Sequence, residues 1–183
     1  MSTAGPVETV VLALGNTLLR DDGVGVVILD ALRAQAPARV PARQTQVSAP
    51  QFCLQGGVEF VDGGTQGLAL LGVLSGRRTA VILDAVALGA APGTVHVLSA
   101  DDAVRMRSHR STTAHEGNAG ELLATARLLG DLPQRTIIIG IEPEEVRTGV
   151  GLSDAVARSV PEAVACARRV LEGSFTYVPG HSG

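Results

Sequence analysis

Apolar residues follow two alternating patterns along the chain. Continuous apolar runs, which are typical of parallel strands covered on both faces, lie at residues 8–14, 78–83 and 135–141. Residues 94–98 are a candidate for a shorter strand, and residues 58–61 either form another strand or extend one that begins near Thr45. Stretches in which apolar residues recur every three or four positions predict helices, and they lie at residues 24–32, 66–75, 117–130 and 152–172. In the last stretch, Ser153 or a residue just before it is the expected N-cap, and Pro161 is a possible kink.

The alternation of strands and helices predicts a three-layer α/β fold with a mostly parallel sheet between helices. We expect one domain over residues 1–183, with flexible tails at 1–7 and 174–183. The segment 37–57 is polar and interrupted by proline and glycine, so we interpret it as a long loop. No internal repeat occurs.

Composition narrows the possible functions. Hydrophobic residues make up 45% of the 183 residues and aromatic residues only 2%, so the core must be aliphatic. A net charge of −3 gives no basic surface for nucleic acid. No apolar run is long enough to cross a membrane, and the N-terminus lacks the pattern of a signal peptide. These features predict a cytoplasmic protein that binds neither nucleic acid nor membrane.

Several common catalytic motifs are absent or incomplete. All fifteen basic residues are Arg, which excludes a P-loop lysine and a Schiff-base lysine. The stretch from Gly23 begins like a dinucleotide-binding motif, but Ile28 replaces its third glycine and two acids precede it. His115-Glu116 begins like a zinc-protease helix, but Ala119 stands at the second histidine position. The two cysteines form no C-x-x-C pair, so a thiolate metal site is not expected.

Ionisable residues instead follow the predicted strands, where ligand sites of α/β sheets form. They are Asp21, Asp22, Asp62, Asp84, His115 and Glu142. Each also has a structural explanation. One of Asp21 and Asp22 can cap the first helix, Asp62 can organise a turn before its two glycines, and Glu142 before Pro143 can be solvated. Taken together, two or three carboxylates and one imidazole suit a divalent cation.

The same residues belong to motifs that occur in a recognisable order. The segments are GNTLLRDDGVG at 15–25, DGGTQG at 62–67, Asp84-Ala85 followed by APGT at 91–94, the Ser/Thr-rich loop with His115, GIEP at 140–143 and GLS at 151–153. Over residues 8–172 the chain resembles the [NiFe]-hydrogenase maturation endopeptidases. The segment 37–57 looks longer than in typical members, and we interpret it as a tolerated surface insertion rather than a determinant of partner choice.

The resemblance implies a five-stranded twisted sheet and an endopeptidase. Such enzymes remove a C-terminal extension from the hydrogenase large-subunit precursor after nickel insertion. The family's metal ligands correspond to Asp22, Asp84 and His115, so the expected metal is nickel recognised in the substrate. The family often has Glu where Asp22 stands, and the shorter side chain would bring the metal closer to the backbone. Asp62 matches an acid that we place near the scissile segment.

For the chemical step, the sequence leaves Asp62 or a metal-site carboxylate such as Asp22 as the general base. No serine or cysteine nucleophile stands out. A non-proteolytic metal-binding or chaperone-like protein of the same fold is the main alternative, and a nucleotide-binding α/β protein is the second. We expect a monomer that engages its client transiently.

Overall fold

The computed structural model describes residues 7–35, 51–55, 57–109 and 119–174. Thirteen elements follow one another in these ranges: β1 (Thr9–Ala13), a 3₁₀ turn (Arg20–Gly23), α1 (Val24–Gln35), β2 (Gln51–Gln55), β3 (Val58–Asp62), a second 3₁₀ turn (Gly67–Leu70), α2 (Leu71–Leu74), β4 (Thr79–Ala85), β5 (Val95–Ser99), α3 (Ala100–His109), α4 (Ala119–Leu129), β6 (Arg135–Ile141) and α5 (Asp154–Leu171). The strand and helix order is that of an α/β domain.

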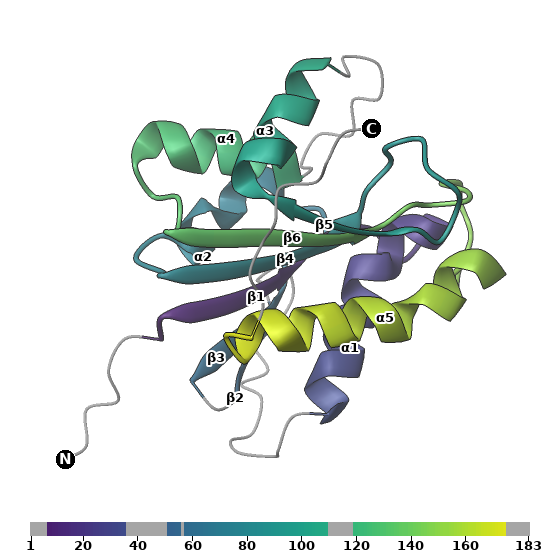
Figure 1. Ribbon diagram of the computed structural model, residues 1–183, viewed down its shortest axis with the longest axis horizontal. Helices are drawn as coiled ribbons and strands as arrows, with labels where there is room; N and C mark the ends of the chain where they lie inside the picture. Colours follow the sequence, from purple (N-terminus) through teal and green to yellow (C-terminus); the bar gives the residue numbers. More distant parts are fainter. Residues whose placement is uncertain (1–6, 36–50, 56, 110–118, 175–183) are drawn as a thin grey trace.

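The strands form one sheet of six in the order β2-β3-β1-β4-β6-β5 (Figure 1). The four inner strands run parallel, and the two edge strands, β2 and β5, pair antiparallel with their neighbours. The loops after β1, β3, β4 and β6 therefore leave the same edge of the sheet, and this edge carries the predicted acids that follow these strands.

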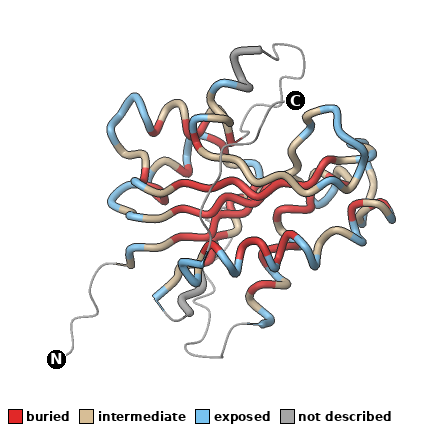
Figure 2. Tube along the Cα trace, in the orientation of Figure 1, coloured by how far each residue is buried: buried red, intermediate tan, exposed pale blue. Residues whose placement is uncertain are grey.

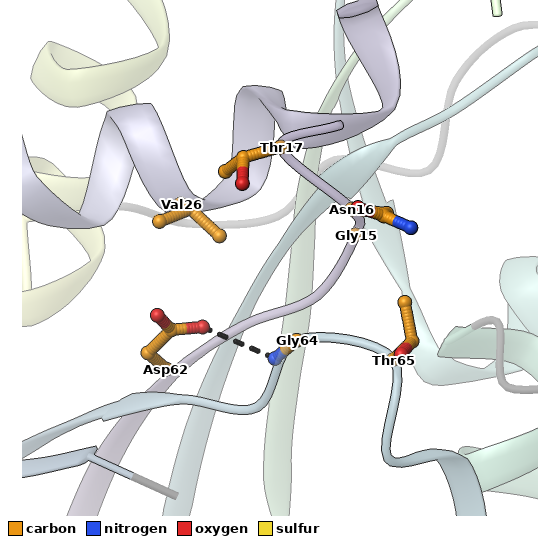
Figure 3. Close-up of a pocket in the computed structure, with 7 residues that line it drawn as sticks. All are labelled: Gly15, Asn16, Thr17, Val26, Asp62, Gly64 and Thr65. Carbon is orange, nitrogen blue, oxygen red and sulfur yellow. Dashed lines mark hydrogen bonds between the residues drawn. The ribbon is translucent and has the colours of Figure 1, made fainter. Parts of the chain in front are cut away.

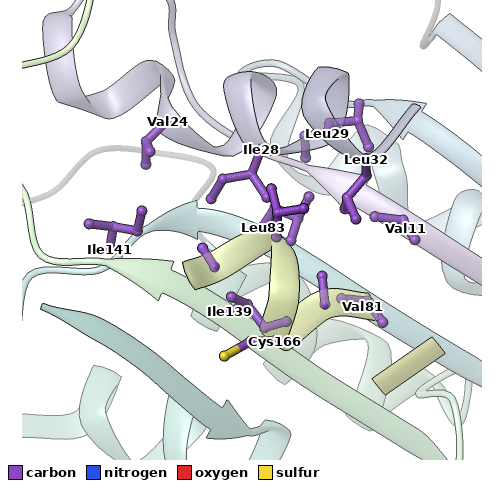
Figure 4. Packing of buried hydrophobic residues seen from close by; sticks show 14 of the residues in the cluster. Val11, Val24, Ile28, Leu29, Leu32, Val81, Leu83, Ile139, Ile141 and Cys166 are labelled. Atoms are coloured by element: carbon purple, nitrogen blue, oxygen red, sulfur yellow. The ribbon is translucent and has the colours of Figure 1, made fainter. Parts of the chain in front are cut away.

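Helices cover both faces of the sheet and bury two aliphatic cores. Helices α1 and α5 pack on one face with residues such as Val11, Leu83 and Ile139 (Figure 4). Helices α2, α3 and α4 cover the other face over Leu12, Ile82 and their neighbours. The inner strands β1, β4 and β6 are buried along most of their length (Figure 2). Burial on both faces explains why their sequences are continuously apolar.

Helix α1 begins directly on the carboxyl ends of β1 and β4. A Cβ atom at Gly25 would lie 2.4 Å from the Leu14 carbonyl oxygen and 2.5 Å from the Leu83 carbonyl oxygen. No side chain fits between the helix and the strands at this point. Gly25 is therefore required for the close packing of α1 on the strands. This packing explains the second glycine of the stretch from Gly23, which resembles the start of a dinucleotide-binding motif.

Most predicted elements are confirmed. Ser153 caps α5, because its hydroxyl oxygen accepts a hydrogen bond from the Val156 amide, and Pro161 lies inside that helix. Two elements differ from the prediction. The sheet has a sixth strand, β2, inside the segment 37–57 that we interpreted as a loop, and α3 was not predicted. The tails at 1–6 and 175–183 and the rest of the predicted loop up to residue 50 lie outside the described residues.

β2 and α3 share a physical cause for escaping prediction. β2 has the sequence QFCLQ and pairs only with β3 at an edge, so tertiary pairing rather than its own pattern forms it. α3 is largely polar, and it packs on the core through Ala100, Ala103 and Val104 near its start. In the described part of the chain, no helix is both long enough and apolar enough to span a membrane.

Candidate active site at the carboxyl edge of the sheet

Asp22 is held by the turn that follows β1. The backbone amide of Asn16 donates to Asp22 Oδ2 over 2.7 Å, and the Asn16 side chain accepts from the Leu18 amide over 2.9 Å. Gly15 makes the close approach possible: it has φ of 115°, and a Cβ there would lie 1.9 Å from the Asp22 carbonyl oxygen. The turn thus fixes one carboxylate oxygen of Asp22 through a backbone donor.

Asp84 lies at the end of β4, in the strand next to β1. Its side chain is only 8% exposed, accepts from its neighbour Ala85 over 2.9 Å, and meets the Ala119 amide at the start of α4 at 3.5 Å. Burial, together with the negative charge of Asp22, raises the pKa of Asp84 to about 7 although two backbone hydrogen bonds act to lower it. Asp22 and Asp84 are therefore close enough to repel each other.

The third predicted ligand, His115, lies outside the described residues. The described residues alone contain no group of three or more His, Cys, Asp or Glu side chains arranged to hold a metal ion. The structure brings together two of the three predicted ligands. Ala119, the first described residue after the histidine, is four positions further along the sequence and contacts Asp84.

Asp62 lies at the end of β3 and faces a pocket of about 200 Å³ (Figure 3). Its Oδ1 accepts a hydrogen bond from the Gly64 amide over 3.1 Å. This bond confirms that Asp62 organises the turn at its two glycines, which the sequence suggested as a structural role. The pocket, called here the Asp62 pocket, is lined by Gly15, Asn16, Thr17, Val26, Asp62, Gly64 and Thr65. Asn16 belongs to this lining and also donates to Asp22, so the pocket and Asp22 share a wall.

The structure corrects the expectation that Asp21 or Asp22 caps the first helix. Asp21 is fully buried and accepts four hydrogen bonds from another loop, namely from the Glu144 amide, the Glu145 amide, and both the amide and the hydroxyl of Ser153. Burial alone would raise the pKa of Asp21, but these donors hold it below its ordinary value. Asp21 therefore joins the β1–α1 loop to the β6–α5 loop, beside Asp22.

Glu142 is also not solvated as the sequence suggested. It is 4% exposed and accepts from the Leu88 amide over 2.7 Å and the Gly89 amide over 2.8 Å, with His96 Nε2 at 2.9 Å. Burial would raise the pKa of Glu142, but the amides and His96 keep it below its ordinary value. Glu142 holds the loop after β4, and sequence reasoning missed His96 as its partner because one histidine in an edge strand carries no pattern.

Fold and site together define an α/β protein with an acidic pair at the carboxyl edge of its sheet, a place where such proteins bind ligands. A hydrogenase maturation protease family model matches residues 47–170. The hydrogenase expression/formation protein HupD of Rhodobacter capsulatus is 33% identical over 91% of this chain and 72% of its own length. The hydrogenase 2 maturation protease of Escherichia coli is 30% identical over 84% of both chains.

Solved structures agree. The hydrogenase maturating endopeptidase HybD from Escherichia coli superposes with a TM-score of 0.72 at 26% identity, covering 91% of this chain and 93% of that one. The [NiFe] hydrogenase maturation protease HybD from Thermococcus kodakarensis gives 0.65 at 26% identity, over 89% and 98%. The chain therefore belongs to the hydrogenase maturation protease family. It is an endopeptidase of hydrogenase maturation, as the sequence motifs predicted.

Proposed function

We propose that this endopeptidase removes the C-terminal extension of a [NiFe]-hydrogenase large-subunit precursor, and that it recognises the nickel ion already bound in that precursor. In this proposal Asp22, Asp84 and His115 provide ligands to open positions on the ion. The observation that carries the proposal is the carboxylate pair of Asp22 and Asp84, which are close in space although 62 positions separate them in sequence.

The electrostatics of the pair support a cation as its partner. Asp84 is buried, and its neighbour is another acid, so its charged form is disfavoured in the free protein. A cation between the two side chains would offset both the repulsion and the lost hydration. Carboxylate and imidazole donors also suit a borderline divalent ion such as nickel. A precursor without nickel would lack this contact and would bind weakly.

The client's nickel could polarise a carbonyl group or increase the acidity of a bound water molecule. The residues of this chain would hold the substrate and accept the proton. Asp22, whose Oδ2 is fixed by the Asn16 amide, is the metal-site carboxylate that could accept the proton. Asp62 is the other candidate base. The cytoplasmic location and the monomeric state stay predictions from the sequence.

A processing assay tests the proposal. Nickel-loaded precursor is incubated with wild-type protein, with Asp84→Asn, with His115→Ala, and with Glu162→Gln as a control that removes one exposed charge on α5. The mass of the large subunit then reports cleavage. We expect wild type and Glu162→Gln to shorten it and the two site variants to lose at least about 100-fold in rate. Normal processing by His115→Ala would remove His115 from the site.

The chaperone-like alternative predicts a different result. The wild-type protein would then bind the precursor in a pull-down but leave its mass unchanged over any incubation time. Binding without shortening, with a precursor that another member of the family cleaves, would contradict the proposed proteolysis.

A further inference from the structure

The β1–α1 loop and the β6–α5 loop are fastened to each other beside the acid pair. Leu19 and Gly149 form an isolated parallel bridge, and the Arg20 amide donates to the Gly149 carbonyl oxygen over 3.1 Å. The Arg20 guanidinium pairs with Glu145 at 2.7 Å. Asp21 adds its four hydrogen bonds from the β6–α5 loop. The two loops therefore form one connected surface.

Arg20 holds a backbone conformation that is unfavourable by itself. Its φ is 54°, and among the described residues it is the one non-glycine residue with a positive φ. Such a conformation persists only where the surrounding contacts enforce it. At Arg20 these contacts are the Glu145 carboxylate, to which Nε donates over 2.8 Å, and the Val150 carbonyl oxygen, to which Nη1 donates over 3.4 Å. Arg147 Nε donates to the same carboxylate over 2.6 Å, so these charges are paired.

The fastened loops present two large apolar side chains to solvent. Leu18 is 63% exposed and Val150 is 77% exposed, and we call these two residues the Leu18–Val150 patch. They are neighbours, because the amide of Gly149, the residue before Val150, donates to the Leu18 carbonyl oxygen over 2.9 Å. A single exposed apolar residue is ordinary on a protein surface. Two neighbours fixed by a strained and ion-paired backbone indicate a binding surface, because apolar side chains favour association once a partner covers them.

The place of the patch indicates which partner covers it. The Asn16 side chain accepts from the Leu18 amide over 2.9 Å, while the Asn16 backbone amide donates to Asp22 Oδ2 over 2.7 Å. The patch therefore borders the carboxylate that we propose to bind the client's nickel. A second copy of this chain on the patch would obstruct Asp22, whereas the precursor has to reach Asp22 to be cut. The precursor is thus the partner that can cover both.

The form of the patch indicates which part of the precursor it contacts. Neither Leu18 nor Val150 belongs to the lining of the Asp62 pocket, and both project into solvent, so the partner must supply a depression that fits them. A folded domain offers such a depression, and an extended C-terminal peptide does not. Because the charges of Arg20, Glu145 and Arg147 are paired with one another, we expect the depression to be aliphatic rather than charged.

We propose that the Leu18–Val150 patch is a docking surface for the folded part of the precursor, where it contacts an aliphatic depression next to the nickel and outside the peptide that is cut. The inference rests on the proposed function and adds to it a contact that does not depend on the metal. Apolar contacts are not screened by salt, so this contribution should stay constant between about 0.1 M and 1 M NaCl.

Binding to nickel-free precursor isolates this contact from the metal. Biolayer interferometry compares wild-type protein with Leu18→Ser, Val150→Ser and the control Leu128→Ser. Leu128 is 87% exposed near the end of α4, which leads to the start of β6 at the opposite edge of the sheet. We expect each patch variant to bind about 5–10-fold more weakly, because burying an aliphatic side chain favours association, and the control to bind like wild type. Absence of any binding by wild-type protein would contradict a contact that does not depend on the metal.

Kinetics on nickel-loaded precursor separate docking from chemistry. Both patch variants should raise KM by the same factor and leave kcat within about twofold of wild type, because docking contributes equally to the bound substrate and to the transition state. Unchanged KM values in both variants, with normal cleavage by wild type, would overturn the docking surface and leave the proposed function intact. If wild-type protein cuts no precursor, patch-dependent binding still supports the docking surface while the proposed proteolysis fails.

A crosslinking measurement identifies the contacted part of the precursor. The photoreactive residue p-benzoylphenylalanine is placed at Leu18, at Val150 or at the control position Leu128, and mass spectrometry maps the crosslinks formed with nickel-loaded precursor. We expect the two patch positions to crosslink to aliphatic residues of the folded large subunit, and the control position to crosslink to none. Crosslinks confined to the C-terminal extension, or formed between two copies of this chain, would contradict the docking surface.

Discussion

Replacing Asp21 by Asn should destabilise the protein strongly although the side chain keeps its shape. Asp21 Oδ2 accepts three hydrogen bonds and Oδ1 accepts one, from the Ser153 amide at 2.6 Å. Asn has only one acceptor oxygen, and in either orientation its NH₂ group faces a donor. In the better orientation it loses the bond to Ser153 and leaves two donors in contact inside the protein.

The expected loss follows from these contacts. A hydrogen bond to a charged group contributes about 1.5–3 kcal/mol, and a buried unsatisfied donor costs about 1–3 kcal/mol. We therefore expect Asp21→Asn to lower the free energy of unfolding by about 3 kcal/mol, which corresponds to a fall in Tm of about 6–12 °C for a chain of this size. Urea unfolding at pH 7, with unchanged m, measures this difference.

The same substitution at Asp30 provides the control. Asp30 is 66% exposed and pairs with Arg33 one turn along α1, so Asp30→Asn should cost at most about 1 kcal/mol. The pKa of Asp21 in the folded protein lies below its ordinary value of 3.8, so its contribution is complete above that pH. The gap between wild type and Asp21→Asn should stay constant from pH 7 to 5 and narrow below about pH 4. A midpoint for Asp21→Asn equal to that of Asp30→Asn would refute the reasoning.

Three further predictions concern the same edge of the sheet. Gly25→Ala should lower the free energy of unfolding, measured in urea, by about 2–3 kcal/mol, because the added Cβ meets two backbone carbonyls. The control Gly72→Ala, which has open space around it, should be neutral or stabilising. Equal effects of the two substitutions would contradict the close packing of α1. Asp84→Asn should raise the free energy of unfolding at pH 8 by about 1–3 kcal/mol while abolishing processing, since the raised pKa of Asp84 means that its charged form opposes folding. That gain should shrink as the pH falls from about 7 toward 4, and a gain independent of pH would argue against the burial of a charge. Glu142→Gln should speed hydrogen exchange at the Leu88 and Gly89 amides, and unchanged exchange would show that Glu142 does not hold the loop. Because the pKa of Glu142 is lowered in the folded protein, the destabilisation caused by Glu142→Gln should fade below about pH 4.5.

The sequence predicted the inner sheet well because burial on both faces imposes a strong local pattern on strands such as β4 and β6. It failed for β2 and α3, whose formation depends on pairing and packing with distant segments rather than on their own periodicity. β2 is a short apolar stretch inside a polar segment rich in proline and glycine, and α3 is largely polar, so neither has the periodicity by which the other elements were predicted.

The sequence predicted that acids follow the ends of the strands. It did not predict which of these acids bind other loops and which belong to the site, because that depends on the three-dimensional structure. Asp21 and Asp22 are adjacent and chemically identical in the sequence, yet Asp21 is buried among four donors from a loop more than 120 positions away, and Asp22 lies close enough to Asp84 for their charges to interact. Glu142 looked solvated because the amides that bury it come from residues 88 and 89. Long-range hydrogen bonds of this kind leave no local pattern.

The most direct test of nickel recognition compares two forms of one precursor. Wild-type protein is incubated with nickel-loaded and with nickel-free large-subunit precursor at equal concentration, and intact-mass spectrometry follows the C-terminal extension over time. We expect that only the nickel-loaded precursor loses its extension. Cleavage of both forms at the same rate would contradict recognition through Asp22, Asp84 and His115.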